Sequence, residues 1–155
     1  MSRSIILRRS PIHGNGVFAA KDIPAGKRLI RYRGLLLTHA AADRRYDGSI
    51  ESGHTFLFTL NERYVLDGNV GSNIARWMNH SCDPNCESVL EENEDGNKKE
   101  DRIFVDAKRD IREGEELTYD YGIRLEVRHT PRLKKLWACR CGSAKCTGTL
   151  LQPKR

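Results

Sequence analysis

Glycine, proline and aspartate interrupt this chain of 155 residues so often that its extended segments must be short. The segments between these breaks are rich in β-branched and aromatic residues, a composition that is typical of β-strands. They comprise residues 16–20, 27–34, 54–60, 63–68, 102–107 and 116–122. Short strands of this kind, separated by turn residues, predict a mainly β protein.

The clearest helical pattern lies in residues 72–80, "SNIARWMNH". Apolar residues recur on one face at helical spacing from Ile74 to Met78, and Ser72 is the expected N-cap. By contrast, residues 90–102 ("LEENEDGNKKEDR") are dense in charge. That density predicts an exposed loop between two strands rather than a functional site.

A weak internal repeat relates residues 18–34 to residues 104–122. The two copies share an Ala-Lys pair, an Asp-Ile pair, an internal glycine and a final glycine. Two copies are too few for a solenoid. The repeat therefore predicts two similar strand–turn–strand units, each with a glycine in its turn.

Composition restricts the class of protein. Hydrophobic residues make up 38% of the chain, which suits one domain with a small appendage. No apolar run approaches the roughly 20 residues of a membrane span, and the start is too polar for a secretory signal, so we expect an intracellular protein without a membrane partner. Lys and Arg outnumber Asp and Glu by 27 to 21. This excess is compatible with binding to nucleic acid, and equally with an ordinary basic surface.

The cysteines favour a metal site. The chain has five, an odd number that a complete set of disulfides cannot use, and three of them lie close together in "CRCGSAKC" (139–146). A structural zinc ion takes four ligands, so one more must come from elsewhere. The candidates are Cys82, Cys86, His80 and His129. Glycines at positions 142 and 148 would allow tight turns around an ion.

Two other readings of these residues remain open. His80 and Cys82 could form a base and nucleophile pair, although no Asp or Asn is placed to orient the histidine. Alternatively, the cysteine-rich end and the positive charge would suit a non-catalytic zinc module that binds nucleic acid or a peptide. That second reading leaves the motif "YDYG" (119–122) without a role.

Five motifs occur in a fixed order: "HGNGVFA" (13–19), "IRYRG" (30–34), "GSNIARWMNHSCDPNC" (71–86), "GEELTYDYG" (114–122) and "CRCGSAKCTGTL" (139–150). Together they resemble the SET domain of protein-lysine methyltransferases with its cysteine-rich post-SET tail. The resemblance implies a fold of short curved sheets, with a C-terminal pseudoknot that places "NHSC" beneath "YDYG". It also implies a minimal, stand-alone enzyme, because no cysteine-rich pre-SET segment precedes the motifs.

The resemblance implies a division of the chain and a set of site residues. A SET domain would span residues 1–123, a connector 124–135 and a zinc-binding tail 136–155. S-adenosylmethionine would bind at one face, and a target lysine would enter from the other. The residues expected to bind the cofactor are Gly14, Asn15, Gly16, Tyr46, Arg76, Asn79 and His80. The predicted zinc ligands are Cys82, Cys139, Cys141 and Cys146, with Cys86 left out.

Three tyrosines carry the implied chemistry. Tyr121 matches the family's catalytic tyrosine, and Tyr32 matches a tyrosine that lines the lysine channel in the family. Tyr119 matches the position where Phe or Tyr alters how many methyl groups fit. The free lysine pKa is about 10.4, and both an apolar channel and an adjacent sulfonium lower it toward the neutral amine that must react. A hydroxyl at position 119 takes space, so we expect mono- or dimethylation rather than trimethylation.

The implied substrate is a lysine in a histone tail or another basic protein. The protein would then work in the cytoplasm of a bacterium, or in a nucleus if it is eukaryotic or acts on host chromatin. Two positions depart from the family pattern: Leu35 replaces a common Glu, and Gly68 replaces a common Ala.

Overall fold

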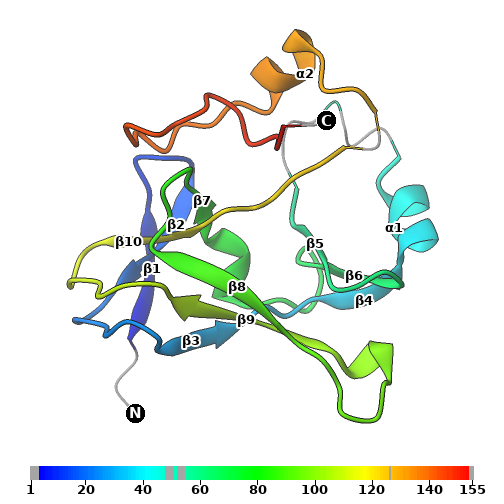
Figure 1. Ribbon diagram of the computed structural model, residues 1–155, viewed down its shortest axis with the longest axis horizontal. Coiled ribbons are helices and arrows are strands. Elements are labelled where there is room, and N and C mark those ends of the chain that lie inside the picture. The colour runs from blue at the N-terminus through cyan, green and yellow to red at the C-terminus, as the bar shows by residue number, and fades with distance from the viewer. Residues whose placement is uncertain (1–3, 48–50, 52–54, 126, 154–155) are drawn as a thin grey trace.

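The computed structural model describes residues 4–47, 51, 55–125 and 127–153, which form three small sheets (Figure 1). The first sheet has the order β1 (Ile5–Arg9), β2 (Asn15–Ala19), β10 (Glu116–Tyr119) and β7 (Asn79–His80). The second has the order β3 (Arg28–Arg31), β9 (Arg102–Ala107) and β8 (Cys86–Glu91), and the third β4 (Leu35–Thr38), β6 (Tyr64–Asp67) and β5 (Leu57–Thr59). The prediction of a mainly β protein with short sheets is confirmed.

Several elements differ from the sequence prediction. Strand β1, strand β4 and helix α1 (His39–Arg45) had no counterpart in it. Other strands are shorter than predicted: β5 begins at Leu57, and the proposed start at residue 54 lies outside the described residues. The charged loop is narrower than expected, because β8 and β9 extend into it and a short 3-10 helix, η3 (Lys98–Glu100), lies between them.

The predicted helix over residues 72–80 is wrong in its extent. Only a 3-10 helix, η2 (Ile74–Trp77), forms there, and its N-cap is Asn73 rather than Ser72. The Asn73 side chain accepts a hydrogen bond from the Ala75 N–H at 3.1 Å. Downstream, the chain becomes extended, because Asn79 and the following residue pair with β10. A long-range strand partner thus overrides the local helical pattern.

The two repeat copies contact each other about a local pseudo-twofold. Ile23 and Ile111 exchange both backbone hydrogen bonds at 2.8 Å. The Asp22 carboxylate accepts from the Glu113 N–H at 2.9 Å, and the Asp110 carboxylate accepts from the Ala25 N–H at 2.8 Å. Both isoleucines are buried in the main core, which also includes Val17, Met78, Cys86, Val105 and Leu117. The repeat therefore builds the centre of the molecule.

Strand β7 lies parallel to β10, with Asn79 opposite Thr118 and His80 opposite Tyr119. This pairing places the "NHSC" segment beside "YDYG", as the expected crossing requires. Pairing continues beyond the strands, because the Ser81 N–H donates to the Tyr119 carbonyl at 3.3 Å. Two motifs far apart in the sequence therefore meet at one edge of the first sheet.

The C-terminal tail packs over that edge. Helix α2 (Pro131–Leu136) contributes Leu133 to a separate small core with Trp137 and Leu151. Leu151 also forms a bridge to Ile123, just after β10. In Figure 1 the orange and red tail crosses the end of the molecule where β2, β7 and β10 meet. No helix among the described residues is long and apolar enough to cross a membrane.

Candidate functional site: a cavity between the first sheet and the tail

A cavity of about 580 Å³ lies between the turn before β2, the segment from η2 to β7, and the tail. Its volume falls within the range of small-molecule sites. Four side chains of the Phe, Tyr and Trp type contribute to its wall: Phe56, Trp77, Tyr121 and Trp137. The full lining consists of residues 9, 12–15, 55–56, 76–77, 79–80, 121, 123, 136–140 and 150.

Most of the residues predicted to bind a cofactor line this cavity: Gly14, Asn15, Arg76, Asn79 and His80. Gly16 and Tyr46 do not. A Cβ on Gly16 would lie 2.5 Å from the Glu116 Oε2, so glycine is needed there for close packing.

Tyr46 lies at the C-cap of α1 and donates its hydroxyl to the Asp67 carboxylate at 2.6 Å. A role for it in ligand binding stays a prediction.

The Arg76 guanidinium packs against two aromatic rings that also contact each other, 4.2 Å from the Phe56 centroid and 4.5 Å from that of Trp77. Among the described residues, the Arg76 Nε is the only buried side-chain nitrogen or oxygen without a hydrogen-bond partner. A buried donor without a partner costs free energy unless a ligand satisfies it. Arg76 therefore fits a ligand that presents a hydrogen-bond acceptor to the cavity.

Asn79 fixes the turn on the opposite side of the cavity. Its Nδ2, which carries two hydrogens, lies within hydrogen-bond distance of three acceptors: the carbonyls of His13 and Asn15 at 3.2 and 3.0 Å, and the Glu116 Oε2 at 2.8 Å. The Ser10 hydroxyl reaches the same carboxylate at 2.7 Å. Sequence reasoning missed Glu116, since nothing in its local pattern marks it as a link between "HGNG" and "NHSC".

A cluster of aromatic side chains adjoins the cavity. Tyr119 and Tyr121 have ring centroids 5.0 Å apart, Phe58 lies 6.0 Å from Tyr119, and Tyr32 lies 4.9 Å from Phe58. The Tyr121 hydroxyl donates to the Met78 carbonyl. Burial raises the pKa values of Tyr32, Tyr119 and Tyr121 well above the ordinary value for tyrosine, so each side chain is a neutral phenol. Of the three, Tyr121 lines the cavity and so joins it to the cluster.

His80 lies against Tyr121 in the lining of the cavity, with the ring centroids 5.4 Å apart. Its Nδ1 accepts the Tyr121 N–H at 3.0 Å, and its Nε2 lies 3.5 Å from the Cys82 Sγ. Burial lowers the pKa of His80, and the nearby Asp120 carboxylate offsets this only in part. Since Nδ1 is already an acceptor, the neutral ring carries its hydrogen on Nε2. That nitrogen cannot take a proton from Cys82, which argues against the base and nucleophile pair.

Four cysteines come together at the tail: Cys82, Cys139, Cys141 and Cys146, with their sulfur atoms all within 4.8 Å of one another. A tetrahedral zinc ion with bonds of about 2.3 Å would have sulfur–sulfur edges of about 3.8 Å. The separation of Cys82 from Cys139 is 3.8 Å. The cluster could therefore hold one metal ion. Gly142 and Gly148 have φ of 73° and 81°, the positive values expected for turns at this site.

The other candidate ligands have different surroundings. Cys86 is fully buried in the main core, where burial raises the pKa of its thiol to about 12. His129 accepts the Leu125 N–H at its Nε2 and contacts the Gln152 carbonyl through Nδ1. Both of its nitrogens are thus used in fastening the tail. Trp137 and Phe56 are site residues that the sequence reasoning did not single out, although Trp137 lies two residues before Cys139.

Comparisons with known proteins agree with this geometry. The sequence model of the SET domain matches residues 14–122. The chain is 38% identical over 144 residues to an H3 lysine-4 specific histone-lysine N-methyltransferase of Chaetomium globosum, covering 92% of this chain and 13% of that protein. It is 37% identical over 150 residues to the histone-lysine N-methyltransferase set1 of Dictyostelium discoideum, covering 96% of this chain and 9% of that protein.

Solved structures of polycomb repressive complex 2 are also similar. The active, stimulated complex matches with a TM-score of 0.69 and 32% identity, covering 79% of this chain and 16% of that one. An autoinhibited form bound to S-adenosylmethionine matches with a TM-score of 0.68 and 32% identity, over 79% of this chain and 15% of that one. The chain thus spans less than a fifth of each relative compared.

Proposed function

We propose that this chain, which belongs to the SET-domain family, transfers methyl groups from S-adenosylmethionine to the ε-amine of a lysine in a protein. One observation carries the proposal: Tyr121 lines the cavity and also packs against the buried tyrosine cluster. A cofactor site and an apolar channel for an amine would meet at this side chain. The methyltransferase names of the relatives support the same reaction.

The cavity suits the proposed cofactor. Arg76 offers an unsatisfied buried donor, and the wall combines aromatic rings with the backbone of the "HGNG" turn. We expect Gly14, Asn15, Asn79 and His80 to contact the cofactor, with the turn held by the Asn79 amide. When bound, S-adenosylmethionine supplies a methyl group on a positively charged sulfur. We expect the cysteine cluster to hold a structural zinc ion that keeps the tail wall in place.

The protein's own part is orientation and exclusion of water. Because the tyrosines are neutral and buried, they do not act as phenolate bases. They form flat walls for the aliphatic stem of lysine, and their faces tolerate a cationic methylated product. Desolvation in such a channel lowers the pKa of the lysine amine and so favours its reactive form.

The finer substrate assignment rests on the relatives. We infer a histone or another basic protein as substrate, which places the activity at chromatin in a eukaryotic nucleus or on host chromatin. The hydroxyl of Tyr119 favours mono- or dimethylation, because it occupies space that additional methyl groups would need. We also propose the division into a SET domain over residues 1–123, a connector over 124–135 and a zinc-binding tail over 136–155.

Calorimetry with S-adenosylmethionine, combined with radiolabelled methyl transfer to histones, tests the proposal. Wild type should bind and transfer. Tyr121→Phe should bind with similar affinity but transfer about 100-fold more slowly, the usual scale for losing one orienting group. Tyr64→Phe is a matched control, because Tyr64 lies on β6 and does not line the cavity. An absence of binding heat in wild type would instead favour a non-catalytic zinc module.

A further inference from the structure

His80 makes contacts beyond those of a cofactor-binding residue. Its side chain is 3% exposed and lies between two functional groups. On one side is the backbone of Tyr121, whose N–H donates to Nδ1 at 3.0 Å. On the other is the Cys82 sulfur, 3.5 Å from Nε2. The ring thus bridges the tyrosine cluster and the cysteine cluster directly.

The hydrogen bond from the Tyr121 N–H to Nδ1 also determines which atom donates in the contact between His80 and Cys82. A backbone N–H can only donate, so Nδ1 must be unprotonated. In the neutral ring the hydrogen is then on Nε2, which can donate to the sulfur of Cys82. A metal-bound thiolate is a better acceptor for that N–H than a free thiol is, because it carries negative charge. We therefore expect this contact to be stronger when the cluster holds a metal ion.

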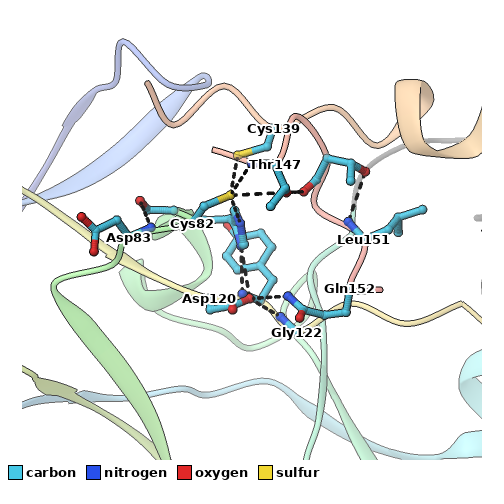
Figure 2. Close-up of polar contacts among 12 residues, drawn as sticks. Cys82, Asp83, Asp120, Gly122, Cys139, Thr147, Leu151 and Gln152 are labelled. Atoms are coloured by element: carbon cyan, nitrogen blue, oxygen red, sulfur yellow. Dashed lines mark hydrogen bonds and ion pairs between the residues drawn. The ribbon is translucent and has the colours of Figure 1, made fainter. Parts of the chain in front are cut away.

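A second connection fastens the tail to the same segment. The Asp120 carboxylate accepts from the Gly122 N–H at 2.9 Å and from the Gln152 side-chain amide at 3.0 Å. Figure 2 shows these contacts below the sulfur of Cys82, which itself lies near Cys139 and Thr147. Asp120 Oδ1 is 3.7 Å from the Nδ1 of His80, outside hydrogen-bond range. Asp120 therefore supports the segment without replacing the Tyr121 N–H as the partner of Nδ1.

We propose that His80 is a positioning residue that couples the metal cluster to Tyr121. It donates to the Cys82 sulfur while it holds the Tyr121 backbone at the cavity. Metal binding at the tail then stabilises the position of Tyr121, and the coupling is reciprocal. The contact between His80 and a metal-bound Cys82 rests on the cysteine cluster. The role of Tyr121 rests on the proposed function.

Two substitutions separate the two contacts. The amide oxygen of Asn stands near the position of Nδ1, whereas the amide nitrogen of Gln stands near that of Nε2. His80→Asn should keep an acceptor for Tyr121 and lose the donor to sulfur. His80→Gln should keep the donor and lose the acceptor. Both residues are uncharged and polar, so the variants differ mainly in which contact survives.

Cobalt-substituted protein provides a readout that does not depend on activity. We expect His80→Asn to shift the sulfur-to-cobalt charge-transfer band and to weaken metal affinity by about 10- to 100-fold in a chelator competition. His80→Gln should keep both near wild type but lower kcat, because the Tyr121 N–H loses its acceptor. His129→Asn is the matched control: it removes another buried histidine that fastens the tail but does not touch Cys82, so the band should not move.

The tautomer can also be measured in the unaltered protein. Nitrogen NMR of the zinc-loaded chain should show His80 with an unprotonated Nδ1 and a protonated Nε2. A hydrogen on Nδ1, or an unchanged band and metal affinity in His80→Asn, would overturn the proposal. If wild type transfers no methyl group, the proposed function fails, while the NMR and cobalt results still decide the link between His80 and Cys82.

Discussion

At the scale of single residues, Gly68 has a steric role. A Cβ at this position would collide with the Tyr32 hydroxyl and lie 2.7 Å from the Phe56 carbonyl, which accepts the Tyr32 hydrogen bond. The departure from the family's common alanine therefore makes room for Tyr32 in its present position. Gly68 and Tyr32 form a matched pair.

Replacing Gly68 with Ala should displace Tyr32 and destabilise the fold by about 1–3 kcal/mol, the usual cost of overpacking. Urea unfolding of a double-mutant cycle measures this directly. In a Tyr32→Phe background the hydroxyl is gone, so Gly68→Ala should cost less, and the cost that remains comes from the contact with the Phe56 carbonyl. Equal costs in the two backgrounds would contradict the pairing.

Tyr119 is 6% exposed and packs between Phe58 and Tyr121. Removing its hydroxyl in Tyr119→Phe should enlarge the space for a methylated amine and shift products toward higher methylation. Mass spectrometry of the modified substrate measures the distribution. The same distribution in wild type and variant would show that the Tyr119 hydroxyl does not limit the product, and Tyr64→Phe serves as the unaffected reference.

At the scale of elements, the tail forms one wall of the cavity through Trp137, Cys139 and Leu150. It has only a small core of its own, so a metal ion at the cysteine cluster should hold much of its position. Removing the metal with a chelator should abolish binding of S-adenosylmethionine while the three sheets stay folded. Calorimetry and circular dichroism report the two effects separately, and full cofactor affinity in metal-free protein would refute this account of the tail.

Sequence predicts elements well where the signal is local or chemical. The strand over residues 102–107 has its predicted bounds, and the cysteine spacing indicates a metal site. Prediction from sequence fails where a distant partner decides the secondary structure. Asn79 and His80 have a helical pattern but form β7, which pairs with β10. Glu116 is a strand residue by pattern, and only folding brings it to the Asn79 amide. The repeat reveals two similar units, but not that Ile23 pairs with Ile111.

At the scale of the whole molecule, three buried tyrosines make stability depend on alkaline pH. Their pKa values are raised in the folded state, whereas the unfolded chain releases these protons near pH 10. Above that pH the unfolded state binds fewer protons, so the free energy of unfolding falls as pH rises, by up to about 1.4 kcal/mol per pH unit for each tyrosine. Urea titrations of wild type and Tyr32→Phe should show a shallower decline in the variant, and parallel declines would contradict the assignment.

The proposed function of the assembled site is lysine methylation. The most direct measurement is mass spectrometry of a histone panel and a cell lysate, incubated with the metal-loaded protein and S-adenosylmethionine, with the modified residue mapped. We expect one or two methyl groups on a lysine side chain, and their loss with Tyr121→Phe. Methylation of a different residue type, or none despite bound cofactor, would contradict the proposed function.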